Sequence, residues 1–173
     1  KIANKYFTFT RQGTNFWAAR DGVPEDKIHP VGSFEIDDFA NIESEKYKEK
    51  NYFLLIDNGF GESKEHGSTG FGMNISQVVD FYGKLDQFSK SHNCTLKVKL
   101  HPASYKSEFY KTVKDVEFIK DAEMKELILE SKGVFCFFSS LTIPAILYKK
   151  VILFDLWHNN FIQTKAKELK VAQ

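Results

Sequence analysis

Two histidine-proline dipeptides and one pair of serines are the residues here whose types and spacing suit chemistry. His101-Pro102 ends the alternating segment "TLKVKLHP", and Ser139-Ser140 follows the apolar segment "GVFCFF". An imidazole and two hydroxyls can all donate hydrogen bonds to a phosphate oxygen. A parallel sheet would bring the ends of both segments to one edge, which predicts a phosphate site there.

Each of these features also has a purely structural explanation. Serine is favoured at the start of a helix whatever the function, and proline ends a strand and fixes the turn that follows. His29-Pro30 favours that explanation, because it follows a short strand within "GVPEDKIHPVG", far from the regular part of the sequence. We interpret His29 as structural and keep both explanations open for His101 and for the two serines.

Other catalytic and metal-binding motifs are missing from the sequence. It has no G-x-S-x-G nucleophile motif, no H-E-x-x-H or C-x-x-C pattern, and no Gly-Lys-Ser/Thr after the glycines of "NGFGESKEHGSTGFGMN". Glu62, Glu65 and His66 of that loop are interpreted as solvated residues. Cys94 and Cys136 have no spacing that suggests a disulfide framework, which favours a reducing, cytoplasmic compartment.

The composition indicates a folded domain without a strong overall charge. With 173 residues, 42% of them hydrophobic and 27% charged, the chain is long enough for a proper core. A formal net charge of +1 provides no global field to attract nucleic acid or a membrane. The chain begins without Met in "KIANKYFTFT" and ends inside a helical pattern, so we expect a piece of a longer protein.

Strand-like and helix-like segments alternate from residue 52 onward. This alternation predicts an α/β fold, a Rossmann-like doubly wound parallel sheet. Strands are expected at 52–57, 96–100, 116–119, 133–138 and 151–156, with helices at 75–92, 106–113, 121–132 and 139–150. We expect residues 51–173 to form a nucleotide-donor-binding domain, and residues 1–50 to hold the end of an N-terminal half and the linker to that domain.

Polar residues follow each expected strand, where ligands of such sheets bind. Asn58 and Gly59 follow the first strand, and Ile119-Lys120 ends the third. Asp121 is the expected N-cap of the next helix, and Glu123 in its first turn could reach a ribose hydroxyl. Ser139-Ser140 is expected to open the last helix, where unpaired N–H groups attract an anion.

The sequence resembles bacterial two-domain GT-B glycosyltransferases. "GVPEDKIHPVGSFEID" looks like their inter-domain passage, whereas "LKVKLHP" and "GVFCFFSSLTIPAILYKKVILF" are similar to the His-Pro and Ser-Ser elements of transferases that use cytidine-activated donors. These are the sialyl- and polysialyltransferases and, more distantly, the cytidine-diphosphate-glycerol polyol-phosphate polymerases. The resemblance covers most of the chain from Gly22 onward, and it implies a GT-B C-terminal half.

The resemblance also implies roles for particular residues. His101 would contact the donor phosphate and stabilise the nucleotide leaving group, with Pro102 beside it, and Ser139-Ser140 would bind the same phosphate. The backbone of Ile119-Lys120 would hold the base, and Glu123 the ribose. Asn58 and Gly59 are included among the donor-binding residues. No metal and no cofactor are implied, since preorganised hydrogen-bond donors can stabilise the departing phosphate.

The same resemblance leaves much of the enzyme outside this chain. The general base would belong to the N-terminal half, so the chain should bind nucleotide yet transfer poorly alone. The expected partners are a cytidine-type nucleotide donor and a glycan or lipid-linked acceptor, with no nucleic acid. Peripheral association with the inner face of the cytoplasmic membrane would depend on the other half. The alternatives are a UDP-sugar transferase or 2-epimerase of this fold, a CDP-polyol phosphotransferase, and a non-catalytic Rossmann-like interaction module.

Overall fold

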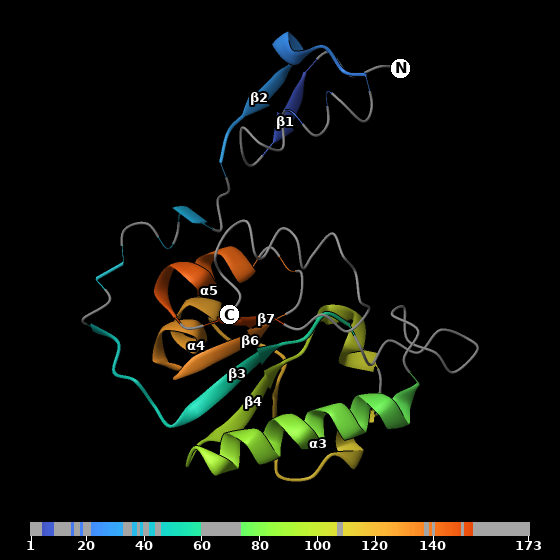
Figure 1. Ribbon diagram of the computed structural model, residues 1–173, viewed down its shortest axis with the longest axis vertical. Coiled ribbons are helices and arrows are strands. Elements are labelled where there is room, and N and C mark those ends of the chain that lie inside the picture. The colour runs from blue at the N-terminus through green and yellow to red at the C-terminus, as the bar shows by residue number, and fades with distance from the viewer. Residues whose placement is uncertain are drawn as a thin grey trace. The chain divides into compact units, whose positions relative to one another are not determined.

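The chain divides into two compact units, Lys1–Glu43 and Ser44–Gln173 (Figure 1). The computed structural model describes residues 5–8, 15, 18, 22–32, 36–37, 39, 42–43, 46–59, 74–106, 109–136, 139, 141–149 and 151–153. The expected roles of Ser140, of the glycine-rich loop from 60 to 73 and of the segment after 153 therefore lie outside the described residues.

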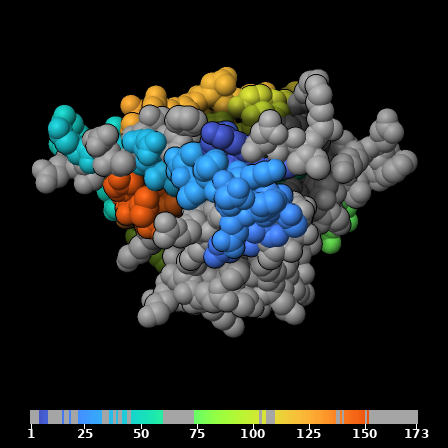
Figure 2. Space-filling model, turned by 90° about the horizontal axis from the view of Figure 1, so that it is seen from above, coloured from blue at the N-terminus to red at the C-terminus, as the bar shows by residue number. Residues whose placement is uncertain are grey.

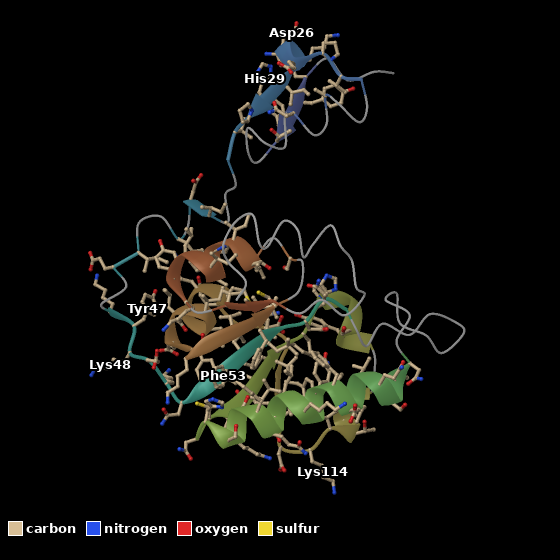
Figure 3. The ribbon with its side chains drawn as sticks, in the orientation of Figure 1. Asp26, His29, Tyr47, Lys48, Phe53 and Lys114 are labelled. Atoms are coloured by element: carbon tan, nitrogen blue, oxygen red, sulfur yellow. The ribbon has the colours of Figure 1, made fainter. Side chains whose placement is uncertain are left out.

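The first unit contains a small parallel pair of strands. β1 (Tyr6–Thr8) pairs with β2 (Ile28–Pro30), and Phe7 lies opposite His29 with ring centroids 6.1 Å apart. The 3-10 helix η1 (Glu25–Lys27) leads directly into β2, and the two form one continuous light-blue surface in Figure 2. His29 thus lies inside a strand of which Pro30 is the last residue, and Figure 3 labels it on β2.

The second unit is built on a five-stranded parallel sheet in the order β5-β4-β3-β6-β7. Its strands are β3 (Tyr52–Ile56), β4 (Thr95–Lys99), β5 (Glu117–Ile119), β6 (Gly133–Cys136) and β7 (Val151–Leu153). The chain runs from the middle strand outward to one edge, then crosses back and runs to the other. This arrangement confirms the predicted α/β, Rossmann-like doubly wound sheet.

Helices cover both faces of this sheet, which explains why β3 is apolar along its whole length. Figure 1 shows α3 (Ile75–Ser91) on one side, and α4 (Met124–Glu130) and α5 (Thr142–Tyr148) on the other. A capping box starts α3: the Asn74 side chain accepts from the Gln77 amide at 2.9 Å, and the Gln77 side chain accepts from the Asn74 amide.

The main core lies between α3 and the sheet. Its buried members come from α3, β3, β4 with the residue that follows it, and β6: Leu55, Val78, Tyr82, Leu85, Leu96, Val98, Leu100 and Phe135. At one end of this core, the Phe53 ring packs against the rings of Phe88 and Phe135, at centroid distances of 5.5 and 5.3 Å. Figure 3 labels Phe53 on β3, at the C-terminal end of α3.

Two predictions about the segments between β4 and α4 are wrong. The helix expected at 106–113 is replaced by two 3-10 helices, η3 (Pro102–Lys106) and η4 (Phe109–Thr112). Pro102 has no N–H and a fixed φ, which suits the first position of a tight helical turn. Asp121 does not cap α4: the N-cap is Glu123, whose side chain makes no capping hydrogen bond.

Within the part of the chain that the structure describes, none of the helices has the length and apolar character needed to cross a membrane.

We predict that the α3-facing core carries much of the second unit's stability. Replacing Leu55, fully buried on β3, with Ala should lower the free energy of unfolding by about 2 to 5 kcal/mol, because it leaves a cavity. The matched change Leu147→Ala on α5, where the side chain is 59% exposed, should cost less than about 0.5 kcal/mol. Urea unfolding followed by circular dichroism measures both. Equal costs would contradict this core assignment.

Candidate functional site

The strand order creates a topological switch point beside β3. Along the sheet, β4 lies on one side of β3 and β6 on the other, and the chain leaves these strands in opposite directions. In open parallel sheets, ligands bind at such a point, outside the carboxyl ends of the strands. Three polar segments gather at this edge: Asp57 to Gly59 after β3, His101 after β4, and Ser139 beyond β6.

Asp57 organises this edge of the sheet. The residue is 3% exposed, and its carboxylate accepts hydrogen bonds from four donors among the described residues. One oxygen accepts from the Gly59 amide at 3.1 Å and the Tyr82 hydroxyl at 3.2 Å. The other accepts from the His101 amide at 3.1 Å and the Ser104 hydroxyl at 2.8 Å. A buried carboxylate is tolerated only with such partners, so Asp57 ties β3, α3, β4 and η3 together.

The contact with Asp57 raises the pKa of Tyr82 and closes a turn at Gly59. Burial, the nearby Asp57 charge and the hydrogen bond between them raise the pKa of Tyr82 well above its ordinary value, so its hydroxyl remains a donor. Gly59 has φ +81°, a left-handed conformation that an L side chain would strain. The Asp57 side chain and the Gly59 amide therefore close a turn that directs the chain away from the end of β3.

His101 presents an exposed side chain on a fixed backbone. Its amide donates to Asp57, and its carbonyl accepts from the Ser104 amide at 2.8 Å. Pro102, which is also exposed, starts η3. The main chain around His101 is thus held at both its N–H and its C=O, whereas the imidazole lies at the surface where a ligand can reach it.

Ser139 lies in a turn before α5 rather than at the helix cap. The residue at the N-cap position is Leu141, with no capping side chain. The Ser139 hydroxyl accepts from the Leu141 amide and the Thr142 hydroxyl accepts from the Ser139 amide, both at 3.3 Å. Pro144 lacks an N–H, so the start of this short helix offers few amides to an anion. A phosphate bound here would have to compete with these long hydrogen bonds.

A buried thiol lies at the end of β6. Cys136 is fully buried, and burial raises the pKa of its thiol to about 11, while the hydrogen bond with Thr142 acts in the opposite direction. The thiol therefore remains protonated at neutral pH and is no nucleophile in the folded protein. Thr142 connects this thiol to the Ser139 turn.

At the end of β5, where the base of a nucleotide is expected, the Ile119 and Lys120 carbonyls already accept hydrogen bonds from the protein. The Ile119 carbonyl accepts from the Leu100 amide at 2.9 Å. The Lys120 carbonyl accepts from Lys99 Nζ at 2.7 Å and also from the Tyr105 hydroxyl. Glu123 is exposed at the start of α4, and no capping bond holds its side chain.

The sheet therefore brings part of the predicted site together. Neighbouring strands are about 5 Å apart, so the ends of β4 and β6, on either side of β3, lie about 10 Å apart. Ile119 is the last residue of β5 and Lys120 follows it, beyond β4 from the switch point. Among the described residues, no group of three or more His, Cys, Asp and Glu side chains is placed to hold a metal ion.

The sequence argument missed the organising role of Asp57. A signal was present: an aspartate that ends the apolar run "YFLLI" and precedes Asn-Gly must either reach solvent or find buried donors. The identity of those donors could not be predicted, because Tyr82 and Ser104 are 25 and 47 residues away along the chain.

Similar folds occur among solved structures. UDP-GlcNAc 2-epimerase from Methanocaldococcus jannaschii matches in two structures, one of them in complex with UDP-GlcNAc and UDP. The first has TM-score 0.55 and 15% identity over 99% of this chain and 51% of that chain. The complex has TM-score 0.63 and 14% identity, over 98% and 49%. The wall teichoic acid polymerase TagF aligns with TM-score 0.45 and 12% identity over 95% and 41%, too low to specify a fold.

No family model and no curated protein sequence matches this chain. The chain spans about half the length of the epimerase structures that it matches. At this level of identity the likeness concerns the fold alone, and that fold is GT-B-like, as the sequence resemblance implied.

We predict that the Asp57 carboxylate is essential for this edge of the sheet. Asp57→Asn replaces one acceptor oxygen with an NH₂ donor that would face other donors, so it should cost about 2 to 4 kcal/mol of unfolding free energy. Ser104→Ala removes one donor and should cost less. The control Asp80→Asn, on the exposed face of α3, removes an i,i+4 pair with Lys84 and should cost less than about 0.5 kcal/mol. Comparable losses for Asp57 and Asp80 would contradict this role.

We also predict a pH dependence from Cys136. The unfolded thiol titrates near 9.0 and the folded one near 11, so the unfolded state releases its proton first. Stability should be unaffected by this group below pH 9, and its contribution should decline by up to about 2 kcal/mol between pH 9 and 11. The measurement is the difference in unfolding free energy between the natural protein and Cys136→Ala across this range. A difference that rises with pH would contradict the prediction.

Proposed function

We propose that the unit Ser44–Gln173 binds the nucleotide part of an activated donor, as the donor-binding half of a glycosyltransferase that builds a bacterial surface polysaccharide or lipooligosaccharide. The observation that carries this proposal is the Asp57 carboxylate, which fixes the main chain at Gly59 and His101 beside the topological switch point. The nucleotide would lie along the strand ends, with its phosphate near His101 and Ser139-Ser140. Its base would lie near Ile119-Lys120, and its ribose near Glu123.

The proposed chemistry is glycosyl transfer without a metal ion. The bond between the anomeric carbon and the phosphate oxygen breaks, and its electron pair stays on that oxygen. His101 and the serine hydroxyls donate hydrogen bonds to the growing charge, and donors held in advance lower the barrier more than mobile ones. The acceptor hydroxyl forms the new bond, and its proton passes to a general base in the N-terminal half.

We propose a cytidine nucleotide donor, of the kind that CMP-sialic acid represents. The sequence resemblance to transferases with cytidine-activated donors supports this choice. A UDP-sugar transferase or 2-epimerase is the second candidate, because the epimerase of similar fold has been solved with UDP-GlcNAc and UDP. A CDP-polyol phosphotransferase would use the same base with a second phosphate.

A binding module without catalysis is the alternative from another class. The amides of Ser139 and Leu141 already have side-chain acceptors, as in an ordinary structural turn. The glycan or lipid-linked acceptor, and a location at the inner face of the cytoplasmic membrane, belong to the enzyme proposal only.

Nucleotide binding is tested by thermal unfolding in the presence of cytidine monophosphate. At about 100 times the dissociation constant, a ligand stabilises the folded state by about 2.7 kcal/mol, which raises the melting temperature by several degrees. His101→Ala should abolish this shift, because it removes the imidazole but leaves the backbone contacts with Asp57 and Ser104 in place.

The matched control is His29→Ala, which alters the other histidine-proline dipeptide and should leave the shift unchanged. Absence of a shift with any cytidine or uridine nucleotide would refute the donor-domain proposal and favour the binding module.

A further inference from the structure

The 3-10 helix η3 is anchored on both sides by two consecutive residues, Ser104 and Tyr105. The Ser104 hydroxyl donates to Asp57, after β3, at 2.8 Å. The Tyr105 hydroxyl donates to the Lys120 carbonyl, after β5. Because β3 and β5 are the two neighbours of β4, η3 is tied to the chain on either side of the strand that precedes it. We call Ser104 and Tyr105 the η3 anchors.

The Ser104 anchor closes a ring of hydrogen bonds around the backbone of His101. One oxygen of Asp57, Oδ2, accepts from the Ser104 hydroxyl and also from the His101 amide, at 3.1 Å. The Ser104 amide donates to the His101 carbonyl at 2.8 Å. Ser104 is fully buried, so water has little access to its hydroxyl. Both the N–H and the C=O of His101 are therefore bound within one ring of three residues.

The Tyr105 anchor is held by contacts with two lysines. Lys99 Nζ donates to the Tyr105 hydroxyl at 3.3 Å, and Lys120 Nζ donates to the Tyr105 carbonyl at 3.4 Å. Since the Tyr105 hydroxyl donates to the Lys120 carbonyl, each of these two residues donates to the backbone of the other. Both ammonium groups also lie 5.7 Å from the centroid of the Tyr105 ring. This end of η3 cannot move without breaking several polar contacts at once.

We infer that Ser104 and Tyr105 are positioning residues, which fix the direction in which His101 presents its imidazole to a phosphate. This inference rests on the proposed function, in which His101 contacts the donor phosphate. A side chain extends from its Cα, so a backbone held at both polar groups limits where the exposed imidazole can lie. Fixing the backbone of one residue in advance is worth a factor of about 5 to 30 in affinity, because binding then requires no further ordering of that residue.

The first measurement is amide hydrogen exchange of the free natural chain and of two variants, Ser104→Ala and Tyr105→Phe, each of which removes one hydroxyl. Exchange of the His101 amide should become about 5- to 30-fold faster in either variant, because local opening around η3 becomes easier. The Leu100 amide, which donates to the Ile119 carbonyl of β5, should change much less. An equal increase at both amides would indicate a general loss of stability and would overturn the inference.

The second measurement is the affinity for cytidine monophosphate by calorimetry. Each anchor variant should bind this nucleotide about 5- to 30-fold more weakly than the natural chain. Faster exchange of the His101 amide with unchanged affinity would contradict a role in ligand binding. Weaker binding with unchanged exchange of that amide would mean that the anchors act by another route, which would also overturn the inference.

The matched controls remove equivalent hydroxyls at the other end of the sheet. Ser131 is also fully buried, and its hydroxyl donates to the Ile128 carbonyl at 2.8 Å, before β6 begins. Tyr52 is the first residue of β3, and its hydroxyl donates to the Leu127 carbonyl at 2.8 Å. Ser131→Ala and Tyr52→Phe should leave the His101 exchange rate and the nucleotide affinity unchanged. Losses as large as those of the anchor variants would count against a specific role of η3.

Failure of the inference and failure of the proposed function give different results. Full affinity in both anchor variants refutes only the inference. If the natural chain binds no nucleotide, the proposed function is refuted, and the exchange measurement alone decides whether the two hydroxyls hold the His101 backbone. Because the anchors contact different strand ends, either variant keeps the test valid if the other does not fold.

Discussion

The carboxylate of Asp57 is the contact on which the rest of the candidate site depends. A negative charge buried at the end of an apolar strand is unfavourable unless donors surround it, and here four donors from four segments do so. Because the buried carboxylate needs these donors, Asp57 also fixes the positions of the segments that supply them. Its hydrogen bonds hold the turn at Gly59, the amide of His101 and the Ser104 hydroxyl of η3 around one carboxylate.

The two ends of this edge, at the Ser139 turn and at Lys120, differ in the hydrogen bonds that their backbone groups make. Near α5, the Ser139 turn satisfies its own amides with side-chain oxygens through long hydrogen bonds, which a charged ligand can displace. Beyond β4, the Lys120 carbonyl is closed by an ammonium and a phenol, so that end offers donors. In the proposal, a phosphate lies near the first end and a pyrimidine base near the second. In the proposal, the exposed imidazole of His101 lies between them, on the strand next to β3.

The fold follows from patterns that the sequence shows openly. The continuous apolar run of β3 predicts a strand covered on both faces, the alternation in β4 predicts a strand with one exposed face, and the helical spacing in α3 predicts a helix packed on the sheet, because burial dictates which positions are apolar. The short connections were harder to predict. A 3-10 helix begins at Pro102, whereas an α-helix was expected to begin at residue 106. The helix α4 begins at Met124, and Asp121 is not its cap. Such ends depend on a few competing hydrogen bonds.

The sequence by itself determined the strands of the main sheet, the long helix α3, the parallel architecture and the polar residues at the strand ends, since these follow from local periodicity and residue chemistry. Only the tertiary structure decided which of those residues share partners. Asp57 finds donors up to 47 residues away, and the Lys120 carbonyl is occupied by Lys99, 21 residues earlier, and by Tyr105. Hydrogen bonds between distant segments depend on strand order and register, which no local pattern contains.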